Sequence, residues 1–241
     1  MKILIVRHGD PDYSIDSLTE RGRVEAELLS QKLCGMDFKE IYVSPLGRAR
    51  ATAEYTLKKL GREGVVCDWL REFSPRIARP DREESIAWDW YPKDWVETDD
   101  FLSIDKWADH PVMAEVGAKE EYDWVCNELD KVLAKHGYER EGRLYKAVAP
   151  NEDTIVFFCH FGLESVLLSH LLNISPMQIW HGFCAAPTSV TTLVTEERAK
   201  GIAYFRMGCF GDTSHLWAAG VEPSFSARFC ETYDNKDQRH D

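Results

Sequence analysis

The chain has 241 residues, 44% of them hydrophobic and 12% aromatic, which suffices for one large α/β core or for one core with an insertion. Its 29 Lys and Arg residues against 41 Asp and Glu residues give a formal net charge of −12, so binding to nucleic acid is not expected, because phosphate backbones attract positively charged proteins. No stretch reaches the roughly 18 consecutive apolar residues of a membrane span, and the first apolar run is too short for a signal peptide, so we expect a cytoplasmic protein that does not bind membranes.

The first predicted element is a buried strand over residues 3–6, a run of four apolar residues. Arg7 and His8 follow where this strand emerges at its carboxyl end, the edge at which open α/β sheets place their ligands. Gly9 removes the Cβ that would block a tight exit or the close approach of a ligand. The tripeptide indicates either an anion site that contains a nucleophile, or an arginine and a histidine with structural roles at a strand end.

A helix is predicted over residues 19–34 and a second strand over 41–43. Polar residues again follow the strand, and Arg48 falls in the first turn of a predicted helix over 47–60. The amino end of a helix offers free N–H groups and partial positive charge to an anion. Arg48 has the wrong charge for that end of a helix, which favours a role in an anion site over a purely structural one.

The chain changes character after a third predicted strand over 65–67. Residues 74–125 hold five of the eight tryptophans and four of the ten prolines, a composition too aromatic for a linker. We interpret this segment, called the insertion below, as a partly helical, Trp-rich lid within a single domain spanning 1–241. Its rings are expected either to form a core of its own or to line the substrate pocket.

A second strand-to-polar transition lies late in the chain. The buried strand over 153–159 ends in His160, and Gly162 leads into a helix, which repeats the design of the first strand. The elements predicted after the insertion are a helix, a hairpin around Gly142, this strand, a helix and two more strands: 120–137, 138–148, 153–159, 163–172, 189–194 and 202–209. Two histidines and two arginines are therefore expected at the carboxyl ends of strands in one α/β sheet.

These motifs resemble those of the histidine phosphatase superfamily, the group that includes cofactor-dependent phosphoglycerate mutase. The resemblance rests on Arg-His-Gly after the first strand, Ser-Pro-x-x-Arg-Ala-x-x-Thr-Ala after the second, Leu-x-Glu after the third and a distal histidine. It covers residues 2–210 apart from the insertion. It implies an α/β fold, a three-layer α/β/α sandwich with a mainly parallel central sheet.

The resemblance also implies residue roles. His8 would be the nucleophile, phosphorylated on a ring nitrogen, and Glu72 would match the proton donor. The residues expected at the phosphoryl group are Arg7, Gly9, Arg48 and His160. The chemistry suits them, because guanidinium binds phosphate bidentately and stays charged, and cationic neighbours keep an imidazole of pKa about 6.5 neutral at pH 7.

No metal and no cofactor is required by this chemistry. The seven cysteines are scattered, odd in number and without a CxxC pair, which indicates neither a zinc site nor a disulfide framework. The Asp10-x-Asp12 pattern superficially fits the magnesium-dependent aspartate phosphatases, yet their first aspartate directly follows a strand. A cysteine phosphatase is not indicated, because no cysteine is followed by an arginine six residues later.

Two departures from the family pattern limit the assignment. Phe161 stands directly after the distal histidine, where acid-phosphatase-like branches place an aspartate donor, so Glu72 is the expected donor. The alternative proton donors are Asp10, Glu83 and Glu84. The acids at 10 and 12 would repel a carboxylated sugar phosphate, which disfavours mutase activity.

The remaining histidines are open to two interpretations. His181 and His215 could reach the pocket, although lone histidines are more often structural, and the others are expected to be structural or solvated: His110, His136, His170 and His240. The sequence thus predicts a metal-independent phosphomonoester hydrolase that acts through a phosphohistidine on a small phosphorylated metabolite. The alternatives are a phosphoglycerate mutase-type phosphotransferase and a non-catalytic phosphoester-binding sensor or scaffold.

Overall fold

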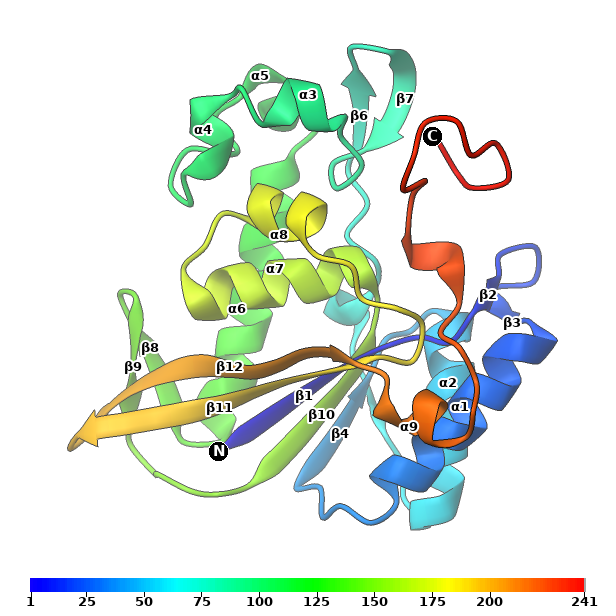
Figure 1. Ribbon diagram of the computed structural model, residues 1–241. Coiled ribbons are helices and arrows are strands. Elements are labelled where there is room, and N and C mark those ends of the chain that lie inside the picture. Colours follow the sequence, from blue (N-terminus) through cyan, green and yellow to red (C-terminus); the bar gives the residue numbers. More distant parts are fainter. Residues whose placement is uncertain (241) are drawn as a thin grey trace.

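The computed structural model describes residues 1–240 and is built around an eight-stranded sheet in the order β5-β4-β10-β1-β11-β12-β9-β8 (Figure 1). Strands β1, β10, β4 and β5 pair in parallel, and the pairs from β1 outward to β8 are antiparallel. Because β1, β10 and β4 are parallel neighbours, their carboxyl ends lie at one edge of the sheet. The strands of the sheet are β1 (Lys2–Arg7), β4 (Glu40–Val43), β5 (Val65–Val66), β8 (Tyr138–Glu141), β9 (Leu144–Ala147), β10 (Thr154–Cys159), β11 (Val190–Ala199) and β12 (Ile202–Asp212).

Helices cover both faces of the sheet, which gives three layers (Figure 1). Since side chains alternate along a strand, Ile3 and Ile5 pack into one core with α6 (Ala118–Lys135), α7 (Phe161–Leu172) and α8 (Pro176–Gly182). Leu4 and Val6 pack into the core on the other face, with α1 (Glu20–Leu33) and α2 (Gly47–Leu60). The predicted α/β/α sandwich is confirmed, with a mixed sheet whose site-bearing half is parallel.

The first two helices begin and end as their sequences predict. The Thr19 hydroxyl accepts a hydrogen bond from the Gly22 N–H at 3.0 Å and so caps α1. Helix α2 ends at Gly61, whose φ of 62° lies in the left-handed region that glycine adopts at little cost. The hairpin of β8 and β9 likewise turns at Gly142, with φ 61°.

The insertion contains a hairpin of β6 (Arg76–Arg79) and β7 (Arg82–Ile86), followed by three one-turn helices, α3 (Pro92–Trp95), α4 (Asp99–Leu102) and α5 (Pro111–Ala114). The hairpin was not predicted, and α6 already starts within the predicted insertion. Trp90, Phe101 and Trp107 join the same core as Ile3 and Ile5. The buried rings of the insertion therefore pack onto the sheet face rather than forming a separate core.

The end of the chain differs most from the prediction. Strands β11 and β12 are longer than expected and turn at Gly201, and α8 was not predicted although Ser175-Pro176 is a typical helix start. After α9 (Ser214–Ala218), the C-terminal segment, residues 222–240, contains the 3-10 turn η2 (Phe225–Ala227) and lies beside the insertion (Figure 1). A small hairpin of β2 (Pro11–Asp12) and β3 (Ser17–Leu18) follows β1. All seven cysteines are unpaired, and no helix within residues 1–240 is both long and apolar enough to cross a membrane.

Candidate active site

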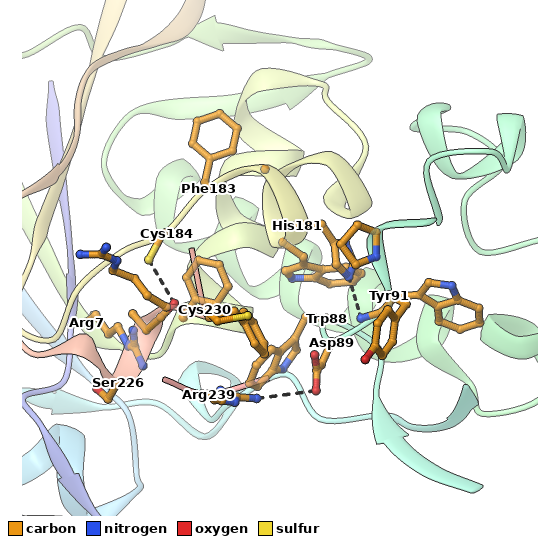
Figure 2. Close-up of a pocket in the computed structure, with 18 of the residues that line it drawn as sticks. Arg7, Trp88, Asp89, Tyr91, His181, Phe183, Cys184, Ser226, Cys230 and Arg239 are labelled. Carbon is orange, nitrogen blue, oxygen red and sulfur yellow. Dashed lines mark hydrogen bonds and ion pairs between the residues drawn. The ribbon is translucent and has the colours of Figure 1, made fainter. Parts of the chain in front are cut away.

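A cavity of about 560 Å³ opens where β1 ends and α7 begins (Figure 2). Arg7, His8 and Glu72 line its inner wall, together with residues of the insertion, of the α8 region and of the C-terminal segment. This is the edge at which the parallel strands end. It is also the size of cavity that holds a small organic ligand.

His8 is held in one orientation by main-chain bonds on both sides. Its N–H donates to the Cys159 carbonyl at 3.0 Å, and its carbonyl accepts from the Thr188 N–H at 3.2 Å. The ring Nδ1 lies 2.7 Å from the Gly9 carbonyl, which can only accept, so we assign the proton to Nδ1 and the free lone pair to Nε2. Burial is the main cause that holds the pKa of His8 well below its ordinary value, and the positive charges of Arg7 and Arg48 lower it further. The ring is therefore a neutral imidazole with an unprotonated nitrogen.

His160 lies next to His8, with the two ring centroids 5.1 Å apart. Its Nε2 contacts the Ser44 hydroxyl at 2.7 Å, and its Nδ1 has no hydrogen-bond partner among residues 1–240. Burial and the neighbouring positive side chains hold its pKa well below the ordinary range. His8 and His160 are therefore neighbours, because β1 and β10 are parallel and end at the same edge of the sheet.

The two arginines keep donors that no protein group in residues 1–240 uses. Arg7 donates through Nη1 to the Ala185 carbonyl at 2.5 Å, and its guanidinium lies 5.9 Å from the Phe161 ring centroid. Arg48 donates through Nη1 to Asp16 Oδ1 at 2.6 Å. The buried Nε of each is unpartnered within the described part of the chain. Arg48, like Gly9 and His160, does not line the cavity itself. It is close enough to lower the pKa of both histidines.

The glycine turn after His8 is tied to the first turn of α2. The Thr52 hydroxyl accepts from the Gly9 N–H at 2.9 Å and donates to the Arg48 carbonyl at 2.8 Å. A Cβ on Gly9 would come within 2.8 Å of the Gly22 carbonyl oxygen. Only glycine therefore allows the turn after β1 to approach α1 this closely. The Thr52 bonds tie the same turn to α2 beside Arg48.

Glu72 lines the cavity at the start of the insertion. Its Oε1 accepts from the Phe73 and Leu163 N–H groups, both at 2.9 Å. Burial raises its pKa, although these bonds and the two arginines act in the opposite direction. A Cβ on Gly162 would lie 2.8 Å from this oxygen and 2.5 Å from the Trp88 ring, so Gly162 makes room for both side chains.

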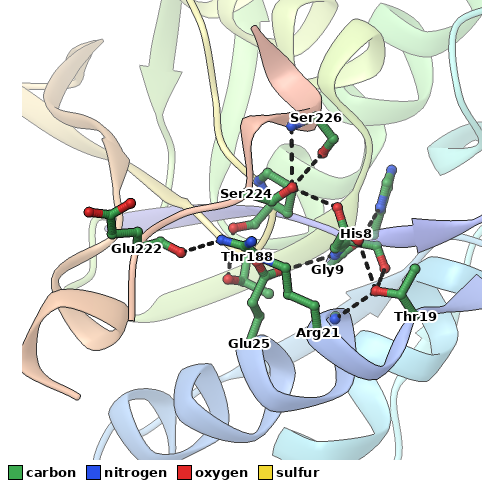
Figure 3. Close-up of polar contacts among 12 residues, drawn as sticks. His8, Gly9, Thr19, Arg21, Glu25, Thr188, Glu222, Ser224 and Ser226 are labelled. Carbon is green, nitrogen blue, oxygen red and sulfur yellow. Dashed lines mark hydrogen bonds and ion pairs between the residues drawn. The ribbon is translucent and has the colours of Figure 1, made fainter. Parts of the chain in front are cut away.

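Asp10, an alternative proton donor and possible pocket residue, and His215, which could have reached the pocket, do not line the cavity. The Asp10 carboxylate accepts from the hydroxyls of Thr19 at 2.8 Å and Ser224 at 2.7 Å, so it joins α1 to the C-terminal segment (Figure 3). His215 contacts the Thr188 hydroxyl at 3.1 Å, and burial lowers its pKa to about 4. The other alternative donors, Glu83 and Glu84, are exposed on β7 away from the cavity.

His181 does line the cavity, but both of its nitrogens are used. Its Nδ1 lies 2.7 Å from the Met177 carbonyl and its Nε2 accepts from the Trp90 N–H at 3.0 Å. Burial lowers its pKa to about 4. The neutral ring therefore joins α8 to the insertion.

Sequence reasoning missed one buried acid, Glu164. Its side chain is in the first turn of α7 and is 1% exposed. Burial raises its pKa to about 7, a contact with the Thr191 hydroxyl and the charge of Arg7 oppose this shift, and Glu72 adds to it. A lone acid in the mostly apolar helix α7 was the available signal. No group of three or more His, Cys, Asp or Glu side chains in residues 1–240 is placed to hold a metal ion.

The structure brings a neutral imidazole, two guanidinium groups and a carboxyl group together at the strand-end edge of an α/β/α sandwich, an arrangement suited to phosphoryl transfer. The family model described as "Histidine phosphatase superfamily (branch 1)" matches residues 3–206. The chain belongs to this family, as its motifs predicted, and is a histidine phosphatase.

Individual relatives agree with this assignment. The chain is 26% identical to "Probable phosphatase C1687.21" of Schizosaccharomyces pombe over 231 residues, which cover 90% of this chain and 95% of that protein. Among solved structures, a phosphoserine phosphatase mutant of Entamoeba histolytica in complex with phosphoserine has a TM-score of 0.60 at 20% identity, covering 89% of this chain and 98% of that one. Mycobacterial glucosyl-3-phosphoglycerate phosphatase in complex with VO3 has a TM-score of 0.54 at 18% identity, with coverage of 88% and 99%. Both solved structures share the fold.

Proposed function

We propose that the protein is a metal-independent phosphomonoester hydrolase that acts on a small phosphorylated metabolite through a phosphohistidine at His8. The observation that carries this proposal is the tautomer of His8. Its Nδ1 faces a carbonyl acceptor, which leaves the Nε2 lone pair unprotonated beside two arginines. The phosphatase names of the relatives support hydrolysis as the overall reaction.

In the first step, His8 Nε2 attacks phosphorus, the P–N bond forms and the ester P–O bond breaks. Arg7 and Arg48 offer N–H donors to the non-bridging oxygens, where negative charge lies in the transition state. His160 lies beside His8 and adds a third donor once the dianion favours its protonated form. The leaving alkoxide takes the proton of Glu72, whose raised pKa favours the acid form.

In the second step, water attacks phosphorus and the P–N bond breaks. Glu72, now a carboxylate, accepts the proton of that water, and inorganic phosphate leaves while His8 returns to its neutral form. The bonds from the Phe73 and Leu163 N–H groups hold the same carboxyl oxygen in both steps. One carboxyl group thus serves as acid and then as base.

The test is hydrolysis of p-nitrophenyl phosphate by the wild-type protein and by His8→Ala, with and without EDTA. Wild type is expected to turn over in EDTA and to trap an acid-labile phosphoenzyme, whereas His8→Ala loses turnover by at least about a thousandfold, since the nucleophile is absent. His170→Gln is the matched control, because His170 pairs with Asp130 on a different side of α7 and lies outside the cavity.

Other outcomes contradict the proposal. Phosphate binding by wild type without turnover would indicate a sensor. Phosphoryl transfer to a phosphoglycerate acceptor in preference to water would indicate a mutase. Activity that EDTA abolishes would exclude the metal-independent reaction.

A further inference from the structure

The wall of the cavity beyond His8 is rich in aromatic rings. These rings come from the β2 region, the insertion, α7, the α8 region and the C-terminal segment: Tyr13, Trp88, Trp90, Tyr91, Phe161, Trp180, Phe183 and Phe229. Phosphate and a short alkyl chain would contact few of them. The shape and composition of the cavity therefore indicate a substrate with a large apolar part.

The indoles nearest the inner wall present ring surface rather than polar atoms. Trp88 donates through Nε1 to the Phe73 carbonyl at 2.6 Å, and Trp180 donates to the Gly162 carbonyl at 2.9 Å. Trp88 also packs edge-on against Phe161, with ring centroids 6.2 Å apart and planes at 87°. Trp180 is 3% exposed because it stacks on Phe73, with ring centroids 5.2 Å apart. The half-buried Trp88, whose N–H group is used elsewhere, offers π surface to the cavity, which favours a flat aromatic ligand over a flexible chain.

A fixed carboxylate interrupts this aromatic wall. Asp89 lines the cavity, and in Figure 2 it lies with Tyr91 on the side away from Arg7. The Arg79 guanidinium, whose side chain is 2% exposed, lies 3.2 Å from Asp89 Oδ1 and donates to the Asp89 carbonyl at 2.9 Å. Arg79 is itself held by Asp81 through two bonds, at 2.8 and 2.7 Å. The orientation of Asp89 is therefore set by a buried arginine, not by solvent.

Two guanidinium groups contact Asp89. Arg79 lies between Asp89 and Asp81, and Arg239 of the C-terminal segment lies 3.8 Å from Asp89 Oδ2, while Arg82 pairs with Asp81 at 3.6 Å. A second anionic group on the ligand would be repelled by Asp89, and a cationic group by the two guanidiniums. A neutral group that donates N–H bonds to the free lone pairs of Asp89 fits best.

The geometry points to a substrate class: a phosphomonoester whose alcohol carries a flat heteroaromatic ring with N–H donors, the chemistry of a nucleoside 5′-monophosphate. The phosphoryl group lies at His8, the ring lies among the indoles and its N–H edge faces Asp89. This inference rests on the proposed function, since it assigns the leaving group of that reaction. It makes Asp89 a specificity residue.

Three substrates with the same primary alkoxide leaving group test it. Ribose 5-phosphate lacks the ring, purine riboside 5′-monophosphate has the ring without N–H donors, and guanosine 5′-monophosphate has both. Phosphate release should show kcat/KM rising about 10-fold from the first to the second through stacking, and about 10-fold again to the third through N–H bonds to a charged acceptor.

Variants of Asp89 test the rise in kcat/KM from the purine riboside ester to the guanosine ester. Asp89→Leu should reduce the ratio between the guanosine and purine riboside esters to near one, and Asp89→Asn, which keeps a partner for Arg79, should reduce it as well. Glu83→Gln, an exposed acid on β7, is the matched control and should leave all three values unchanged. Two variants are used so that a folding defect of one does not decide the result.

The outcomes separate the two proposals. Equal kcat/KM values for the three substrates in an active wild-type enzyme would overturn the inference and leave the hydrolase intact. A guanosine preference that survives in both Asp89 variants would overturn the role of Asp89. Absence of turnover with all three esters and with p-nitrophenyl phosphate would instead contradict the proposed function.

Discussion

Two carboxyl groups near the phosphate site, Glu72 and Glu164, have pKa values that burial raises, but their surroundings differ. Glu72 lines the cavity and has two main-chain donors on one oxygen, so it can exchange a proton with a ligand. Glu164 is 1% exposed and does not line the cavity. Glu72 can therefore take part in proton transfer, whereas Glu164 is expected to change the stability of the fold with its charge.

Replacing Glu72 by Gln should affect esters according to their leaving group. Glycerol phosphate needs a proton on its alkoxide, so its turnover should fall by about 10² to 10⁴. p-Nitrophenolate leaves without a proton, so phosphorylation of His8 by its ester should be far less affected, and rapid-quench measurements should show a burst of one equivalent before slow turnover. Equal losses of the phosphorylation rate with both esters would contradict the assignment of Glu72 as proton donor.

Glu164 should make stability depend on pH. Its pKa rises from 4.5 in the unfolded chain to about 7 in the folded protein, so the folded state binds the extra proton between these values. The free energy of unfolding therefore falls as pH rises from 4.5 to 7 and levels off above, by up to about 3 kcal/mol for this group. Urea unfolding should show Glu164→Gln gaining up to this amount over wild type between pH 4.5 and 7.5.

The matched control for that series is again Glu83→Gln, which replaces an exposed acid on β7 in the same way. A Glu164→Gln curve parallel to that of wild type would show that the buried carboxyl group is solvated in the native protein.

Single residues could be predicted where a motif lies at a strand end. Arg7, His8 and His160 follow apolar runs that had to be buried strands, so their place at one edge was readable. Glu164 and Asp89 were not, because their surroundings depend on how α7 packs on β1 and how the insertion folds back on α8. The residues next to Glu164 and Asp89 in the sequence therefore do not indicate where these two side chains lie.

At the scale of elements, the loop between β2 and β3 positions the start of α2. Asp16, with φ 44°, accepts from the Gly47 N–H through Oδ2 and from Arg48 through Oδ1, both at 2.6 Å. A Cβ on Gly47 would lie 2.1 Å from the Asp16 carbonyl oxygen, so the loop and the helix fit only with glycine there. The loop thus acts as a cap for a helix that has no side-chain cap of its own.

Asp16→Ala should destabilise the protein by about 2 kcal/mol, of which about 1 is the lost cap and about 1 the left-handed backbone of a residue with a Cβ. Asp16→Asn tolerates that backbone and keeps an acceptor, so it should lose less than about 1 kcal/mol. Urea unfolding of the two variants checks this. An alanine variant as stable as the asparagine variant would mean that the loop does not support α2.

Elements with strong periodicity or clear end signals were predicted to within a few residues, as for β1, α1, α2 and β10. The hairpin of β6 and β7 and the helix α8 were not, since short elements gain their stability from tertiary contacts rather than from their own sequence. His181 shows this, because its bond to the Trp90 N–H holds α8 against a segment 91 residues away.

For the whole molecule, the C-terminal segment bridges parts that the rest of the fold leaves separate. It is bonded to α1 through the Glu222 carbonyl and Arg21 at 2.5 Å, and to Asp10 through Ser224 (Figure 3). It contacts the insertion through Arg239 and Asp89 (Figure 2). It lies beyond residue 206, where the family match ends. Neither composition nor motif indicated that it would form part of the cavity.

A variant that ends at Val221 should remain folded, because no apolar side chain in residues 222–240 is buried. We expect a loss of at most about 2 kcal/mol in urea unfolding, the value of a few exposed hydrogen bonds, together with a higher KM for the guanosine ester as one wall of the cavity is removed. Loss of the cooperative transition would show that the segment is required for folding.

The indoles around the cavity give the protein its own optical probe. Trp88, Trp90 and Trp180 line the site, and of these Trp88 is the one that is more than 6% exposed. The other five tryptophans do not line the cavity and supply a constant background emission. A ligand that displaces water from Trp88 should change its fluorescence without any label. Affinities of inert analogues and product inhibition can therefore be followed by simple spectroscopic titration of the unmodified protein.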